Sequence, residues 1–139
     1  MKHIRAGSTY VIRLDRGEKV VETLTRFCEK RKVRSAFFQG IGTCRRAELG
    51  FFLMDKGRYK FRKVPGDQEI TSLTGNVSLL DGKPFIHAHI VLGGSDFISH
   101  SGHLKEAEVL ATCEIVLTPL SRSLTRTHSR STGLTLLDF

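Results

Sequence analysis

Four of the six histidines in this sequence lie within one short stretch, residues 87–103. His87 and His89 are two positions apart in an apolar run, so both side chains would project from the same face of a β-strand. A glycine-containing loop that folds back could bring His103 or His100 beside them. Three imidazole nitrogens suit a zinc-like ion, and the spacing therefore predicts a metal site.

A catalytic role for such a site would need an acid or a base near the metal position. Glu48, Glu69 and Asp96 are the candidate carboxylates, although each could equally be a surface group or an arginine partner. Cys44 could act as a nucleophile, but an inert, partly buried thiol is the more common case. The histidines could also form only a polar cluster or a subunit contact, so catalysis stays an alternative.

The composition is that of a folded globular chain, and we expect a single domain over residues 1–139. Hydrophobic residues make up 40% and charged residues 26%, which is ordinary for such a domain. Lys and Arg number 22 against 14 Asp and Glu, a formal net charge of +8. This excess could attract duplex DNA, but it could also serve only solubility, because the basic residues are spread along the chain.

The cysteines and the N-terminal sequence indicate in which cellular compartment the protein is expected. Cys28, Cys44 and Cys113 are far apart and form no C-x-x-C pair, so neither a disulfide framework nor a thiolate zinc site is indicated. The first residues lack the apolar core of a signal peptide, and no apolar run is long enough to cross a bilayer. We expect a soluble, cytoplasmic protein without a membrane partner.

The hydrophobic periodicity predicts a mostly antiparallel β-sheet with one main amphipathic helix, an α/β fold of the α+β type. Apolar residues recur at three- and four-residue steps only in residues 18–32, which we assign to the helix. The Gly40-Ile41-Gly42 sequence indicates a tight turn after a short buried strand, and residues 105–108 a second turn. Strands are predicted at residues 9–14, 35–39, 47–54, 59–64, 70–80, 84–92, 109–117 and 133–139.

Several short motifs together resemble the PPC domain, the plants and prokaryotes conserved domain. The similarity covers nearly the whole chain, and the combination is more specific than any one motif. The matching segments are Gly40-Ile41-Gly42, Glu69-Ile70-Thr71-Ser72-Leu73-Thr74-Gly75-Asn76, Asp81-Gly82-Lys83-Pro84, His87-Ala88-His89 and Ser101-Gly102-His103-Leu104.

The resemblance implies a mostly antiparallel sheet and a homotrimer. It also implies a zinc-like ion held by His87, His89 and His103, whereas His100 has no clear counterpart. The usual Gly-Gly-His-Leu sequence is here Ser101-Gly102-His103-Leu104, which keeps the ligand. Plant members of the family resemble regulators that bind AT-rich DNA through a separate Arg-Gly-Arg-Pro segment, which these 139 residues do not contain. The leading hypothesis is a metal-binding, DNA-binding or regulatory protein, and the alternative is a metal-dependent enzyme or small-ligand binder.

Overall fold

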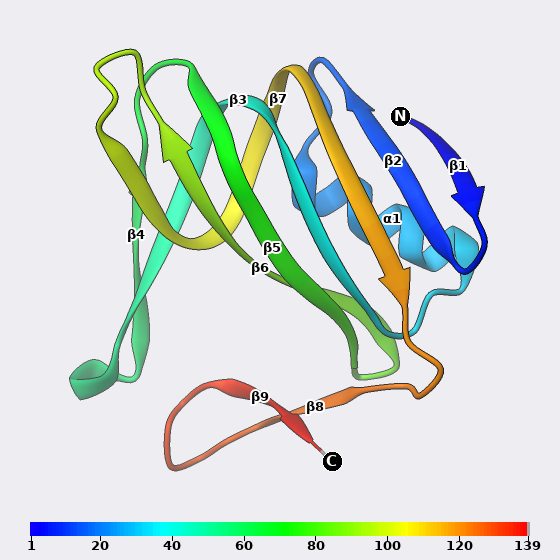
Figure 1. Cartoon of the computed structure of the whole chain (residues 1–139). Coiled ribbons are helices and arrows are strands. Elements are labelled where there is room, and N and C mark those ends of the chain that lie inside the picture. Colours follow the sequence, from blue (N-terminus) through cyan, green and yellow to red (C-terminus); the bar gives the residue numbers. More distant parts are fainter. Residues whose placement is uncertain (139) are drawn as a thin grey trace.

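The computed structural model describes residues 1–138 and consists of one strongly curved sheet with a helix packed on one face (Figure 1). The α+β class and the main helix are as predicted. The elements are β1 (Lys2–Ala6), β2 (Thr9–Asp15), α1 (Val20–Arg31), β3 (Ala36–Leu53), the 3-10 turn η1 (Met54–Lys56), β4 (Arg58–Lys63), β5 (Gln68–Leu80), β6 (Lys83–Gly93), β7 (Ser99–Pro119), β8 (Thr125–His128) and β9 (Thr135–Asp138).

The strand pairing closes part of the sheet on itself. The order β1-β2-β7-β3-β5 runs through antiparallel neighbours, and β6 pairs with both β5 and β7. Strands β3, β5, β6 and β7 thus form a closed ring of pairings. Strand β4 extends from β3 as an arm, and the β8-β9 hairpin lies across one end of the sheet, joined to β5 at a single parallel pair (Figure 1).

The predicted helix is confirmed, and its apolar stripe forms part of the core. Val20, Leu24, Phe27 and Cys28 are buried against the inner face of the sheet. Burial of a side chain of this size stabilises the fold by about 1.5–3 kcal/mol. The helix ends at Lys32, whose left-handed conformation lets its backbone N–H bond back to the last turn.

The turn predicted at Gly40-Ile41-Gly42 is wrong, because these residues continue an 18-residue strand, β3. The glycines serve close packing against β7. A Cβ atom on Gly40 would lie 2.6 Å from the Glu114 carbonyl oxygen, and one on Gly42 would lie 2.7 Å from Cys113 Cα. Glycine inside a strand marks such an approach of a second backbone, and the register shifts beside Gly42.

The turn predicted at residues 105–108 is also wrong, since β7 runs unbroken through them. The polar residues there serve the helix instead. The Glu106 carboxylate accepts hydrogen bonds from the backbone N–H groups of Val21 and Glu22, at 2.8 and 3.1 Å. It thereby satisfies donors that the first turn of α1 leaves free.

The ends of the chain also differ from expectation. Strands β1 and β8 were not predicted, and the last strand is β9 rather than residues 133–139, with Phe139 outside the described residues. The alternation in residues 59–64 would turn both Tyr59 and Phe61 inward, but only Tyr59 is half-buried, and Phe61 is 41% exposed. None of the helices in residues 1–138 is long and apolar enough to cross a membrane.

Candidate metal centre

Strand β6 places His87 and His89 on one face, as the alternation predicted. Their neighbours Ile86, Ala88 and Ile90 are buried on the other face. The backbone of β5 comes very close behind the pair, because Gly75 pairs with Ala88 and has no side chain. A Cβ atom there would collide with the His87 carbonyl oxygen and would lie 2.5 Å from Phe38 Cζ.

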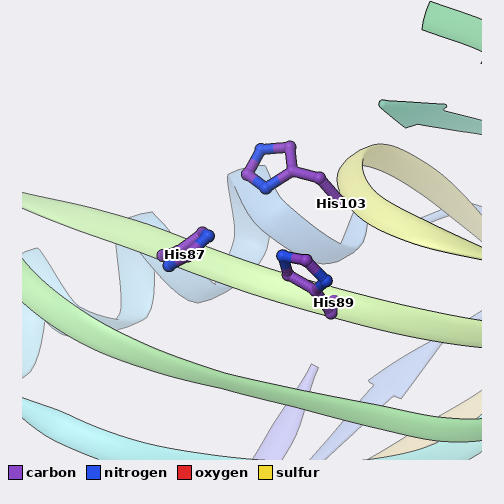
Figure 2. A group of neighbouring side chains, drawn as sticks. All are labelled: His87, His89 and His103. Carbon is purple, nitrogen blue, oxygen red and sulfur yellow. The ribbon is translucent and has the colours of Figure 1, made fainter. Parts of the chain in front are cut away.

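The third histidine comes from the neighbouring strand. His103 on β7 pairs directly with His89 on β6, and on its other side with Gly50 on β3. One ligand atom from each of His87, His89 and His103 lies within 4.8 Å of the others. Figure 2 shows the three rings converging from these two strands. The strand register, rather than the flexible glycine loop we expected, therefore brings His103 to the pair.

His100 does not join this group. It pairs with Leu92, whose side chain lies on the buried face of β6, opposite to the face that carries His89. Because His100 and His103 are three residues apart on a strand, they project from opposite faces. His100 instead lines a separate depression with Lys60 and Arg62.

The electrostatics of the cluster favour neutral imidazoles. Burial, with Arg126 and the two other histidines nearby, lowers the pKa of His87 to about 4. Burial and the His89 ring also lower the pKa of His103 from its usual value. Neutral imidazole is the form that binds a metal, so these two ligands need no deprotonation at neutral pH.

The donor set fits a divalent ion of the zinc type. His103 Nδ1 is buried and has no hydrogen-bond partner among the described residues, which is costly for a polar atom unless something binds it. Three imidazoles that converge on one point are a ligand set found in zinc sites with an open position. His87, His89 and His103 would hold the ion.

Arg126 on β8 is a residue of the site that the sequence did not reveal. Its side chain is 7% exposed and donates to Ser78 Oγ at 2.8 Å, Asn76 Oδ1 at 2.9 Å and the Thr135 carbonyl oxygen at 2.8 Å. A further contact of 3.2 Å joins it to His87 Nδ1. It lies in a Ser-, Thr- and Arg-rich stretch before the last strand, where no local sequence signal marks it.

The histidines face a cavity of about 730 Å³. The surface of the wall is mostly apolar, and Arg58 and Arg126 supply its formal charges. No carboxylate side chain is among its described lining residues, which are Gly50, Phe51, Phe52, Gly57, Arg58, Tyr59, Phe85, His87, His89, Ser101, Gly102, His103, Arg126, Gly133, Leu134, Thr135 and Leu136.

The structure brings none of the predicted catalytic candidates into the cavity lining. Glu48 pairs with Lys105 at 3.2 Å, and Asp96 accepts a hydrogen bond from the backbone N–H of Ile98. Glu69 lies exposed near the start of β5. Cys44 is buried, and burial raises its pKa to about 12, so it remains a thiol rather than a nucleophilic thiolate.

The fold and the histidine site are consistent with one protein family, which a family model identifies. The model of the Plants and Prokaryotes Conserved domain, abbreviated PCC or PPC, matches residues 1–121. The chain belongs to this family, as the sequence motifs predicted. None of the curated proteins matches it in sequence.

Solved structures agree closely with this fold. A putative DNA-binding protein from Bacteroides thetaiotaomicron is 29% identical, with a TM-score of 0.96 over 99% of this chain and 96% of that chain. A plant- and prokaryote-conserved protein from Pyrococcus horikoshii is 36% identical, with a TM-score of 0.88 over 99% and 94%. A metal-containing protein from Archaeoglobus fulgidus is 37% identical, with a TM-score of 0.88 over 95% and 94%.

Proposed function

We propose that this protein binds a divalent metal ion of the zinc type through His87, His89 and His103, and that it acts as a single-domain DNA-binding or regulatory protein. The convergence of the three imidazoles, with His103 Nδ1 buried and unpartnered, is the observation that carries the metal assignment. The metal-containing relative from Archaeoglobus fulgidus supports it. Three buried free thiols fit a reducing compartment such as the cytoplasm.

An ion held by three neutral imidazoles keeps one coordination position for an outside ligand. The strands of the chain would orient the three histidine side chains that bind the ion. The β6-β7 register fixes His89 against His103, and the absence of a Cβ at Gly75 lets β5 support the backbone beneath His87. The described cavity lining offers no carboxylate as a general base, so the site favours binding over acid-base catalysis.

Zinc titration of metal-free protein tests this assignment. We expect one ion per chain with wild type and a loss of that binding in His103→Ala. His100→Ala is the matched control, because His100 lies three residues away on the same strand but projects from the opposite face. If His103→Ala binds zinc as tightly as wild type, the assignment fails.

The DNA component rests on charge and on relatives. The names of the Bacteroides protein and of a 27% identical protein from Ralstonia eutropha both describe putative DNA-binding proteins. In this chain, the arm formed by η1 and β4 carries five exposed basic residues and one acidic residue, Asp55, a density that residues 26–34 at the end of α1 equal. The basic residues of the arm are Lys56, Arg58, Lys60, Arg62 and Lys63.

A salt series of duplex-DNA binding by fluorescence anisotropy tests this component. Phosphate contacts make affinity fall steeply with salt, with a slope in log units of about 0.9 per contact. Substituting Lys60, Arg62 and Lys63 by Ala should lower that slope by up to about 3. A triple Ala variant of Lys30, Arg31 and Lys32, at the end of α1, is the charge-matched control. No binding at low salt, or an equal loss in both variants, would contradict the role of the arm.

We also propose that the chain assembles as a homotrimer, as the family resemblance implies. An exposed apolar row on the outer sheet face supports a contact with further copies. Ile4, Val11 and Val116 are directly paired across β1, β2 and β7. On β3, the exposed Phe37 and Ile41 flank Gln39, the residue that pairs with Val116.

The mass in solution tests this assembly. Wild type should have three times the mass of the 15.6 kDa chain by light scattering. Val116→Lys should shift it to monomer, because a charge would enter the apolar contact. Ser131→Lys, on an exposed terminal segment, adds the same charge elsewhere and should leave the mass unchanged. A monomeric wild type would refute the proposal.

A further inference from the structure

Arg126 is a buried cation without a counter-ion. Its side chain is 7% exposed, yet its partners are a hydroxyl, an amide oxygen, a carbonyl oxygen and an imidazole nitrogen, all neutral. Among residues 1–138 it pairs with no carboxylate. A buried charge is costly unless an opposite charge compensates it. The cavity at Arg126 therefore favours an anion from outside the chain.

A metal ion bound by the histidines would strengthen the preference of the cavity for an anion. Arg126 can only donate, so its contact with His87 Nδ1 requires that nitrogen to accept. A neutral imidazole that ligates through one nitrogen carries a proton on the other, and then neither nitrogen can accept from arginine. Occupation of the site must break the Arg126–His87 contact, which releases an Arg126 N–H and places two positive groups side by side.

The walls of the cavity indicate which chemical groups the rest of the ligand would carry. Phe85 lies against the guanidinium of Arg126, with 5.4 Å between the guanidinium carbon and the ring centroid. Phe52 and Tyr59 contact each other edge to face with centroids 5.0 Å apart, and Leu134 and Leu136 from the terminal hairpin complete an apolar wall. Such walls suit a ligand with an apolar body.

We propose that this cavity binds a small organic carboxylate, with its carboxylate beside the three histidines and held by Arg126, and its apolar part against the aromatic wall. This inference deepens the proposed metal function, because the anion and the ion would share one site. Once the His87 contact is broken, three of the five Arg126 N–H groups still bind Ser78, Asn76 and Thr135, so two donors remain for the anion. A monoanionic carboxylate needs fewer donors than a phosphate dianion.

Calorimetry with benzoate on the full-length, zinc-loaded protein tests the proposal, and benzamide is the neutral control of the same shape. We expect benzoate to bind and benzamide to bind at least about tenfold more weakly, since a hydrogen-bonded charge pair contributes on that order. Equal affinity of the two compounds would overturn the proposal. Inorganic phosphate that binds more tightly than benzoate would overturn the choice of a carboxylate.

An Arg126→Met variant distinguishes the contribution of Arg126 to benzoate binding from its effect on zinc binding. We expect benzoate affinity to fall by about tenfold or more. In carboxylate-free buffer its zinc affinity should rise, by about tenfold, because the competing cation is gone. An Arg126→Met protein that folds and keeps wild-type benzoate affinity would refute the role of Arg126. If that variant does not fold, the comparison of benzoate with benzamide on wild type still decides the matter.

The outcomes distinguish this inference from the metal assignment. Zinc binding without benzoate binding would overturn the carboxylate site and leave the metal site standing. Benzoate binding by a wild-type protein that binds no zinc would support the Arg126 site and refute the metal function. Joint binding with each ligand raising the affinity for the other would support both, because such coupling is reciprocal.

Discussion

Replacement of Gly75 by Ala is a stringent test of how the fold supports the candidate metal site. The added Cβ would collide with the His87 carbonyl oxygen and lie 2.5 Å from Phe38 Cζ and 3.0 Å from Ala88 Cα. Two of these three atoms belong to the backbone of β6 and cannot move separately from the strand. Overpacking of this kind costs about 1–3 kcal/mol. The lower entropy of the unfolded Ala chain offsets about 0.5 kcal/mol.

We therefore expect a net loss of about 1.5 kcal/mol in the free energy of unfolding. With an unfolding entropy of about 0.29 kcal/mol/K for a chain of this length, Tm should fall by about 5 °C. Gly93→Ala is the matched control on the same strand pair, since its Cβ would make an ordinary 3.5 Å contact with Thr71 Cγ2. Thermal unfolding by circular dichroism at equal protein concentration measures both variants.

The displacement of β6 should also weaken zinc binding in Gly75→Ala, because His87 moves away from His103. Gly93→Ala should keep both Tm and zinc affinity close to wild type. A Gly75→Ala protein as stable as Gly93→Ala, with the same zinc affinity, would refute the reasoning that this close strand approach supports the histidines.

Further predictions concern titratable groups. The metal-free protein should lose about 2 kcal/mol of stability as pH falls from 6.5 to 4, because only the unfolded chain protonates His87 in that window. A His87→Gln variant should show a smaller loss in denaturant titrations, since only the part due to His103 remains, and an equal loss in both proteins would contradict the prediction. Burial raises the pKa of Cys28, Cys44 and Cys113 to about 12. A thiol reagent at pH 8 should label none of them until the chain unfolds, and rapid labelling of the native protein would be the contrary result.

Local patterns predicted the parts of the fold that depend on neighbours in sequence. The alternation around His87 and His89 fixed their common face, because a strand has a period of two residues. The helix followed from apolar residues at three- and four-residue steps, which its buried stripe confirms. Asp81 and Gly82 form the turn between β5 and β6, and this pair of residues is by itself a signal for a two-residue hairpin.

The errors arose where distant segments decide the local structure. Gly40 and Gly42 resemble a turn in sequence, but they are required by the β7 backbone some 70 positions later in the chain. The polar Glu106 resembles a turn residue, but it caps α1. Arg126 reaches the site through Ser78 and Asn76, which are 48 and 50 residues away. No periodicity or motif could reveal this contact, because it exists only after β5 and β8 have met.

Elemental analysis of protein purified without added metal tests the central claim most directly. We predict close to one zinc-like ion per chain in wild type and in His100→Ala. The His87→Ala and His89→Ala variants should contain almost none, provided that circular dichroism shows them folded. Equal metal content in these two variants and in wild type would contradict the assignment of the three histidines as a metal centre.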